Sequence, residues 1–462
     1  MIISQLPELF VQRERALLGP RFDAMFSYPG QGAVRGASVN ALRCTPQQFA
    51  ALADFPLEAS PFCPSAFVVP QPDWKPGRHP YHHAGAFYAQ EPSASAPAAL
   101  LDVHPGMRVA DLCAAPGGKT SQLAAALPGQ GVLLANEFVA ARAEVLRQNL
   151  ERMGVTNAIV TNGDTARLAA AYPGQFDRIL VDAPCSGEGM FRKIPEARDE
   201  WSENNVKICA VRQAEILREA WKTLRPGGLL IYSTCTFNRL ENEGSLEGLL
   251  AEAGEEIVES TAFDCPPAWG VVCGRVGPFR TFRFYPHRTR GEGFFAAVAR
   301  KVSDGGSRVR VPKSRRTIFA PAGRRECAEL SRWVAEPERM RFAAVADVYY
   351  AYYESQYEAV KMLAESLRVI ASGVAMGQIF KERLKPDHAL AMFCGLDRGA
   401  VPVAELSEEE ALRFLRKQEA EAAAFAEGMN LVTHGGAALG FAKRIQNRVN
   451  NMYPNSLRIF NL

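Results

Sequence analysis

The stretch DLCAAPGGKT, residues 111–120, decides the fold. It follows an apolar run with strand character and leads into residues 119–127, whose apolar spacing is helical, so it predicts a glycine turn between a strand and a helix. Backbone N–H groups and the positive end of a helix dipole meet at such a turn and bind the polar groups of a ligand. The sequence therefore predicts a ligand site here.

Two familiar phosphate-binding loops do not fit this turn. A Walker A loop requires Gly six residues before its lysine, where this chain has Cys113, and no GxGxxG pattern can be placed over the turn. An S-adenosylmethionine pocket requires glycines for close approach of the methionine part and an acid at the end of the next strand for the ribose hydroxyls. Glu137 ends the strand expected at residues 131–136, and Asp164 follows the strand expected at residues 157–161. A plain glycine turn with surface acids remains the alternative.

Outward from the turn, apolar strand-like runs alternate with helical stretches between residues 107 and 301. The expected strands are residues 108–112, 131–136, 157–161, 178–182, 228–233 and 294–298, and the expected helices include residues 119–127, 140–153 and 206–223. Continuous apolar strands separated by helices predict an α/β fold whose mostly parallel sheet is covered on both faces. Ligands of such sheets bind at the carboxyl ends of the strands.

The regions on either side differ in composition. Residues 1–104 are rich in Pro, Gly and aromatic side chains, which favours a small α+β domain before the α/β domain of residues 105–302. Residues 303–331 are expected to be a basic linker, because seven Lys and Arg face one acid between residues 303 and 325. A solvated hinge is the alternative. Residues 332–462 are expected to be globular, with a helix that begins at Ser407 and Glu410 in capping-box spacing.

Length and charge exclude several classes of protein. The chain has 462 residues, of which 47% are hydrophobic, and a net charge of +3, which excludes a histone-like basic coat and suits about three folded units. No signal peptide and no apolar run of about 18 residues is apparent, so we expect a soluble cytoplasmic protein without a membrane partner. None of the ten cysteines forms a CxxC pair, and the loop histidines His79, His82 and His83 lack a ligand set, so no metal is expected.

Two cysteines follow the ends of expected strands. Cys185 comes after residues 178–182, and Cys235 comes after residues 228–233, each among polar residues rather than in an apolar core. Carbon 5 of a pyrimidine is a poor nucleophile toward a methyl sulfonium, but attack of a thiolate on carbon 6 converts the ring into an enamine that accepts the methyl group. Asp182 is placed to provide the proton donor that the ring then needs. A buried structural thiol is the alternative for either cysteine.

Several segments together carry a resemblance: CAAPGGKT (residues 113–120), NE (136–137), NGD (162–164), DAPCSGEGMFRK (182–193) and YSTCTFNRLENE (232–243). They resemble the Nol/Nop/Sun family of RNA cytosine-5 methyltransferases, in its bacterial small-subunit ribosomal RNA, RsmF-type branch. RFYPHRTRGEGFF (283–295) is similar to the family's last catalytic-domain motif, and the region after residue 332 looks like its appended RNA-binding domain of PUA type.

The resemblance implies a Rossmann-like class I methyltransferase domain with a mostly parallel seven-stranded sheet and S-adenosylmethionine as the methyl donor. It implies that Cys235 is the nucleophile and that Cys185 assists release of the methylated base; the spacing alone does not rank the two. Lys193 is implied to hold the turn at Pro184 or the substrate backbone, and Asp182 to contact the cytosine. The implied cofactor-binding residues are Cys113, Ala114, Ala115, Pro116, Gly117, Gly118, Lys119, Glu137, Asp164 and Asp182.

The expected reaction is therefore formation of 5-methylcytosine in 16S ribosomal RNA through a covalent adduct between cysteine and cytosine carbon 6. The RNA partner is naked 16S ribosomal RNA or the assembled small subunit, and nothing points to an obligate protein partner. Transfer RNA methylation by the same chemistry stays open, as does a non-catalytic assembly factor. Phosphate contacts are expected from residues 303–325, the tail beyond residue 427 and residues Arg283, His287, Arg288 and Arg290.

Overall fold

Ten strands form the central sheet of the computed structural model, which describes residues 3–26, 33–129, 131–259, 265–302 and 319–460. Along the sheet their order is β11-β12-β13-β9-β8-β5-β6-β7-β17, and β10 pairs with β13. Their bounds are β5 Arg108–Asp111, β6 Val132–Glu137, β7 Ala158–Asn162, β8 Phe176–Asp182, β9 Leu224–Thr234, β10 Ile257–Val258, β11 Val272–Val276, β12 Phe279–Phe284, β13 Phe294–Lys301 and β17 Arg368–Ser372. Each of the six expected strands is present.

The five strands β7-β6-β5-β8-β9 are parallel, and β13 and β12 continue the sheet in antiparallel pairing. These seven are the strands that the class I methyltransferase fold implies. The sheet nevertheless exceeds seven strands, because β10 and β11 extend one side and β17 pairs with β7 on the other. β17 lies in the C-terminal part of the sequence, so its pairing with β7 is long-range and no local pattern predicts it.

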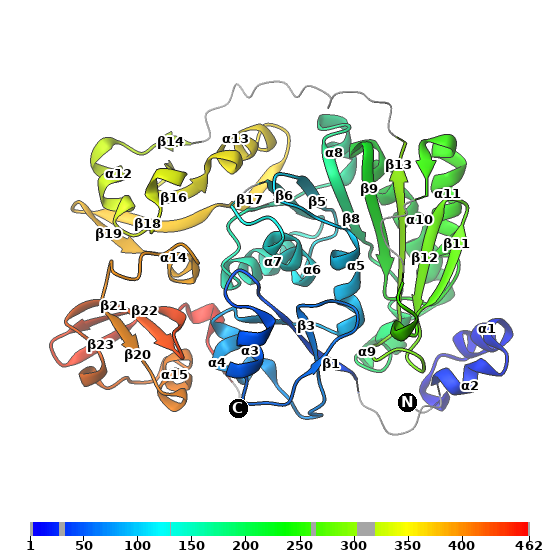
Figure 1. Cartoon of the computed structure of the whole chain (residues 1–462), viewed down its shortest axis with the longest axis horizontal. Coiled ribbons are helices and arrows are strands. Elements are labelled where there is room, and N and C mark those ends of the chain that lie inside the picture. Colours follow the sequence, from blue (N-terminus) through cyan, green and yellow to red (C-terminus); the bar gives the residue numbers. More distant parts are fainter. Residues whose placement is uncertain (1–2, 27–32, 130, 260–264, 303–318, 461–462) are drawn as a thin grey trace.

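Both faces of the central sheet are buried, which explains its continuous apolar strands. On β8, Ile179 and Val181 pack in one core and Leu180 packs in the other, since side chains alternate along a strand. One face is covered by α8 Thr165–Ala171, α10 Glu203–Thr223, α11 Glu243–Ala253 and α13 Glu354–Leu363; the other is covered by α5 Ala96–Leu100, α6 Gly118–Ala125 and α7 Ala140–Arg152 (Figure 1).

The N-terminal region has a sheet of its own beside two separate helices. Its strands, in the order β2-β3-β1-β4, are β1 Arg35–Val39, β2 Glu58–Ala59, β3 Ala66–Val69 and β4 Phe87–Ala89, with α3 Pro46–Leu52 and α4 Pro80–His83. Helices α1 Glu8–Leu18 and α2 Arg21–Phe26 lie away from this sheet, at the lower right of Figure 1. Their aromatic side chains pack with Phe191, Trp201 and Phe237 of the central domain.

The C-terminal region contains two further sheets. The first, β14-β15-β16-β18-β19, is built from β14 Ala320–Pro321, β15 Met340–Val345, β16 Val348–Tyr353, β18 Val374–Phe380 and β19 Arg383–Pro386, with α12 Arg324–Ser331 and α14 His388–Met392. The second, β20-β21-β22-β23, is built from β20 Val403–Glu405, β21 Gly428–His434, β22 Ala437–Ile445 and β23 Arg448–Asn451. The expected capping box of Ser407 and Glu410 opens α15 Glu408–Leu415.

Of the stretch expected to be a basic linker, residues 303–318 lie outside the described residues. The remainder holds β14 and α12, and Leu330 of α12 is fully buried in the core of the first C-terminal sheet. No helix among the described residues is both long and apolar enough to cross a membrane.

Candidate active site

The predicted glycine turn leaves β5 and opens α6 at the carboxyl edge of the central sheet. Gly117 has φ +111°, a backbone conformation that side chains with a Cβ rarely adopt. A Cβ on Gly118 would lie 3.0 Å from the ring of Tyr88, whose hydroxyl donates to the carbonyl of Pro116 at 3.3 Å. At each of these two positions, backbone conformation or a close neighbour favours glycine over a residue with a side chain. In the same turn Pro116 is exposed, Ala114 and Ala115 are buried, and Cys113 is half-buried.

Four neighbouring strands carry a carboxylate at this edge. In the sheet order β8-β5-β6-β7, Asp182, Asp111 and Glu137 are the last residues of their strands, and Asp164 follows β7 by two residues. S-adenosylmethionine carries an ammonium group, two ribose hydroxyls and an adenine amino group, which are hydrogen-bond donors and suit carboxylate acceptors. Its own carboxylate is an acceptor and suits the backbone N–H groups of the glycine turn. The glycine turn and this row of acids fit that molecule.

Asp111 is the member of this row that the sequence interpretation missed. Its carboxylate is buried and accepts a hydrogen bond from Thr120 Oγ1 at 2.8 Å. Burial raises the pKa of Asp111 to about 7. The sequence offers one indication that Asp111 belongs to the site, because it is the last residue of the strand before the glycine turn.

Glu137 and Asp164 differ in their surroundings. Glu137 is buried, and its Oε1 accepts from the backbone N–H of Val139 at 2.9 Å. Asp164 is exposed and caps the N-terminus of α8 by accepting from Ala166 N at 2.8 Å. Arg142, on the first turn of α7, donates to the carbonyl of Ala115 at 2.8 Å and so ties the glycine turn to the next helix.

Asp182 lies where the row of acids meets the cysteines. Its Oδ2 is 2.7 Å from Lys119 Nζ, and its Oδ1 accepts from Ser233 Oγ at 2.7 Å. The Lys119 ammonium group also lies 5.1 Å from the centre of the Phe294 ring. Lys119 thus contacts a carboxylate of the site rather than projecting into solvent.

Cys185 and Cys235 are brought together although 50 residues separate them, with 3.3 Å between their Sγ atoms. They follow β8 and β9, which are adjacent and parallel, so both chains leave the sheet at the same edge. The hydrogen bond with Cys235, followed by burial, raises the pKa of Cys185 well above its usual value. The thiolate form of Cys185 is therefore disfavoured while this contact is in place.

Two buried carboxylates, Glu188 and Glu241, hold the cysteine-bearing loops, and sequence reasoning missed both. Glu241 accepts from the backbone N–H of Ser186 at 2.9 Å and from the Gln213 amide at 2.8 Å, and it also accepts from the Ser186 hydroxyl. Lys193 is exposed, and among the contacts of the described residues its side chain makes none that holds Pro184, whose carbonyl accepts from Gln213 at 2.9 Å. The turn is held by Gln213 and Glu241 instead.

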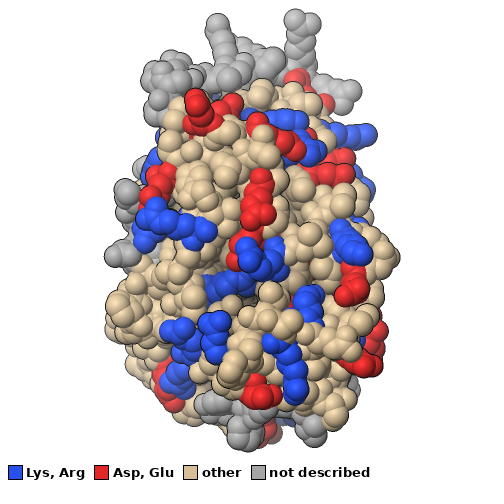
Figure 2. Space-filling view, turned by 90° about the vertical axis from the view of Figure 1, so that its right-hand side faces the viewer, with Lys and Arg blue, Asp and Glu red and all other residues tan. Residues whose placement is uncertain are grey.

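The residues expected to contact phosphate fall into two groups. Arg283 is engaged internally, since it forms a double hydrogen bond with Glu243 at 2.5 and 2.7 Å and donates to the carbonyl of Phe237. Arg288 and Arg290 are both exposed, and Arg290 pairs with Glu58. On the face that Figure 2 shows, Lys and Arg are spread among Asp and Glu rather than gathered in one patch.

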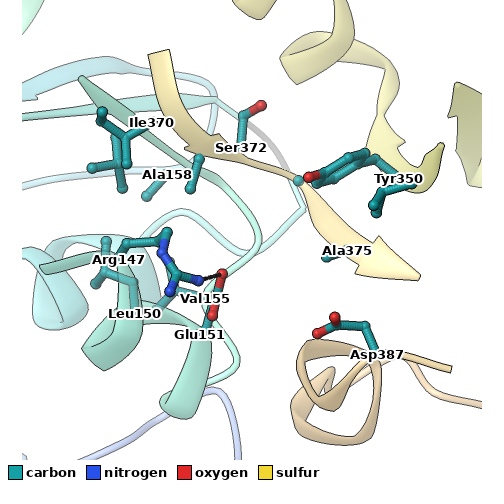
Figure 3. A pocket seen from close by; sticks show the side chains of 14 residues that line it. Arg147, Leu150, Glu151, Val155, Ala158, Tyr350, Ile370, Ser372, Ala375 and Asp387 are labelled. Atoms are coloured by element: carbon teal, nitrogen blue, oxygen red, sulfur yellow. Dashed lines mark hydrogen bonds and ion pairs between the residues drawn. The ribbon is translucent and has the colours of Figure 1, made fainter. Parts of the chain in front are cut away.

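A cavity of about 300 Å³ lies between α7 and the first C-terminal sheet (Figure 3). Arg147 and Glu151, paired at 2.5 Å, line one side, and Tyr350 and Asp387 line the other. Because these α7 residues belong to its second half, the cavity is near the start of β7, at the opposite edge of the sheet from the cysteines. None of the residues that line it belongs to the glycine turn or to the row of acids.

Of the loop histidines His79, His82 and His83, two are hydrogen-bonded to protein groups, and the buried Nδ1 of His82 has no hydrogen-bond partner among the described residues. His79 Nε2 pairs with Asp54 at 2.8 Å, and His83 contacts the hydroxyl of Tyr453 at 3.0 Å and the carbonyl of Gly77 at 2.9 Å. No cluster of three or more His, Cys, Asp or Glu suited to a metal occurs in the described part of the chain.

Comparison with known proteins identifies three segments by family. The model for 16S rRNA methyltransferase RsmB/F matches residues 98–300, that for the N-terminal domain of 16S rRNA methyltransferase RsmF matches residues 6–92, and that for the methyltransferase RsmF PUA domain matches residues 401–459. The match of the PUA model corresponds to the last sheet, β20 to β23.

Curated relatives match nearly the whole chain. Ribosomal RNA small subunit methyltransferase F of Salmonella paratyphi B is 33% identical over 98% of this chain and 96% of its own length, and that of Aliivibrio fischeri MJ11 is 32% identical over 92% and 91%. A crystal structure of a methyltransferase homologue from Pyrococcus horikoshii has 28% identity and a TM-score of 0.55, covering 65% of this chain and 100% of that chain. NSun6 from Pyrococcus horikoshii with SFG shares the fold, with a TM-score of 0.55 at 20% identity over 66% of this chain and all of that one.

These matches confirm the resemblance carried by the motifs: the chain belongs to the RsmF family of S-adenosylmethionine-dependent 16S ribosomal RNA methyltransferases.

Proposed function

We propose that this protein methylates carbon 5 of a cytosine in 16S ribosomal RNA, with Cys235 as the nucleophile and Cys185 as the residue that assists release. The observation that carries the proposal is the 3.3 Å contact between the two thiols at the ends of adjacent parallel strands, next to the glycine turn and Asp182. Membership in a family of 16S ribosomal RNA methyltransferases supports the substrate.

When bound, S-adenosylmethionine supplies the electrophilic methyl group. The sulfur of Cys235 forms a bond to carbon 6 of the cytosine, and the electron pair displaced toward carbon 5 takes up that methyl group as its bond to the sulfonium sulfur breaks and leaves a neutral thioether. Asp182, the carboxylate at the end of β8 just before the first cysteine-bearing loop, is proposed to hold the amide edge of the ring and to move the proton there. A base then removes the proton from carbon 5 as the bond from carbon 6 to Cys235 breaks.

The contact between the two thiols also supports a proposed order in which they act. The contact with Cys235 is the largest cause that raises the pKa of Cys185. Once Cys235 is bonded to carbon 6 it no longer forms the thiol–thiol hydrogen bond, so the largest cause that raises the pKa of Cys185 is removed and Cys185 gives up its proton more easily. Cys185 thus becomes available as a base at the stage where the adduct requires one.

The target cytosine must be single-stranded or flipped out of its helix before its carbon 6 can reach a thiolate. Flipping costs a few kcal/mol. We propose that the last sheet, whose strands β22 and β23 carry Lys443, Arg444 and Arg448, contributes phosphate contacts. We further propose that the protein acts in the cytoplasm on ribosomal RNA without an obligate protein partner.

Replacement of each thiol tests this proposal. Cys235→Ala is expected to abolish methyl transfer and the covalent complex with RNA that carries 5-azacytosine, whereas Cys185→Ala is expected to accumulate an adduct that survives denaturation. Cys273→Ala, which removes an exposed thiol of β11, is the matched control and should leave both unchanged. A Cys235→Ala variant that still transfers methyl groups contradicts the assignment of the nucleophile.

The substrate is tested separately by bisulfite sequencing of ribosomal and transfer RNA from cells with and without the gene. Parallel assays on naked 16S ribosomal RNA and on assembled small subunits identify the form that is methylated. If the gene is needed only for a 5-methylcytosine in transfer RNA, the proposed substrate is wrong. If cells without the gene keep every 5-methylcytosine, a non-catalytic role is favoured.

A further inference from the structure

The Glu188 carboxylate connects the two cysteine-bearing loops. It lies three residues after Cys185, and its side chain is fully buried. Its Oε2 accepts from the backbone N–H groups of Phe237 and Asn238, both at 3.0 Å, and these residues follow Cys235 by two and three positions. A single carboxylate on the first loop therefore fixes the backbone of the second.

The other oxygen of Glu188 reaches the N-terminal helix. Its Oε1 accepts from Trp201 Nε1 at 3.0 Å and from Arg13 Nη2 at 2.7 Å. Arg13 belongs to α1, which lies 175 residues earlier in the chain and outside the methyltransferase sheet. The positive charge beside Glu188 is thus supplied by the N-terminal helix rather than by the catalytic domain.

Arg13 is fixed in this position by its surroundings. Its guanidinium group lies 5.3 Å from the centre of the Phe10 ring and 5.5 Å from that of Trp201, and its Nε contacts Glu14 at 2.9 Å. The Phe10 ring in turn packs edge-on against Phe191, at 5.1 Å between centres. Aromatic contacts therefore dock α1 on the first cysteine-bearing loop and place one cation against its buried carboxylate.

The contacts of Glu241 provide a comparison. Glu241 is equally buried and joins the same loops, but its donors are Ser186, Gln213 and Asn238, all neutral. Burial raises the pKa of Glu241, as expected for a carboxylate without a cation beside it. A buried charge that loses the cation beside it must draw in water or change its hydrogen bonds. For Glu188, the bonds at risk are those to the backbone beside Cys235.

We propose that Arg13 is a positioning residue for methyl transfer: through Glu188 it holds the two cysteine-bearing loops so that Cys185 and Cys235 face each other. The N-terminal helix is then part of the catalytic machinery as well as of the N-terminal region. The inference rests on the proposed roles of the two cysteines.

Arg13→Met tests the inference, because methionine keeps an apolar stem against Phe10 and Trp201 and removes the charge. The control is Arg15→Met on the same helix, since Arg15 pairs with Asp23 where both side chains are more than half exposed. We expect Arg13→Met to lower kcat at saturating RNA and methyl donor by at least tenfold with KM changed less than threefold. The rate of adduct formation with 5-azacytosine RNA should fall by the same factor, and Arg15→Met should stay within twofold of the wild type.

Two further variants separate positioning from loss of folding. Arg13→Lys, which restores the charge, should recover most of the lost kcat. Adding Glu188→Gln to Arg13→Met should cost less than the product of the two single effects, because the unpaired carboxylate is gone. An unchanged kcat in Arg13→Met, a change in KM alone, or strictly multiplicative losses would each overturn the inference. If Cys235→Ala remains active, the proposed function fails instead, whatever Arg13→Met does.

Discussion

Gly117 offers a direct test of the cofactor turn. With φ at +111°, an alanine there is strained by about 1–2 kcal/mol, and its Cβ would lie 3.1 Å from Leu146 of α7. The turn can relieve this strain only by changing its backbone path. The methyl donor must then restore the original path when it binds, at the same cost.

The expected consequence is weaker binding of S-adenosylmethionine by Gly117→Ala, by about 5- to 30-fold, because every 1.4 kcal/mol is a factor of ten. Isothermal titration calorimetry with S-adenosylmethionine measures the effect without RNA. The matched control is Gly106→Ala, in the turn before β5, where φ is also positive at +87° and nothing lies within 4 Å of the added Cβ.

Gly106→Ala has a similar backbone strain at the opposite end of β5, so its affinity for the methyl donor should match the wild type. Equal weakening in both variants would show a general loss of stability rather than a role of the turn. Wild-type affinity in Gly117→Ala would refute the reasoning, because it would mean that the methyl donor does not depend on this backbone path.

Three further outcomes follow from the described contacts. The hydrogen bond with Cys235 is the largest cause that raises the pKa of Cys185, so Cys235→Ala should lower that pKa. Alkylation of Cys185 by iodoacetamide at pH 8, measured by mass spectrometry, should then be faster. Slower alkylation would contradict the coupling. Asp182→Asn can keep its contact with Ser233 but loses its charge beside Lys119. We therefore expect kcat to fall about 10²- to 10⁴-fold while the Kd for S-adenosylmethionine changes less. A change in Kd alone would contradict a role of Asp182 in proton transfer. Arg288 is exposed, so Arg288→Ala should reduce the slope of the logarithm of the RNA binding constant against the logarithm of the salt concentration by about 1. Arg283 is bound to Glu243, so Arg283→Ala should leave this slope unchanged and lower the midpoint temperature of unfolding.

The sequence predicted the parallel sheet because its strands are buried on both faces, and both the apolar runs and the intervening helices are local patterns. It also placed Glu137, Asp164, Asp182 and both cysteines at strand ends, and the structure brings the two cysteines together. It did not predict β17, because the pairing of residues 368–372 with β7 depends on how a distant region folds back.

Sequence reasoning also failed for buried charge. A carboxylate in a polar loop and an arginine are both usually exposed, so the sequence around Glu188, Glu241 and Arg283 does not indicate that these side chains are engaged inside the protein. Each is buried or half-buried with a specific partner that lies far away in the sequence. Burial of a charge is a property of the folded chain, and a linear pattern does not encode the partner that makes it possible.

The order of the strands explains how one edge of the central sheet can serve both parts of the proposed reaction, binding of the methyl donor and attack on the cytosine. Asp111, Glu137 and Asp164 end or follow β5, β6 and β7, while the thiols follow β8 and β9. Asp182, at the end of β8, is the border between the two groups, and Lys119 of the glycine turn reaches across to it. If the first group holds the methyl donor, as we propose, its methyl group faces the second group. In the proposed reaction Cys235 attacks carbon 6, so carbon 5 meets the methyl group only if both loops keep their positions. That requirement is the reason we propose a positioning role for Glu188, and through it for Arg13, in a reaction that neither residue touches.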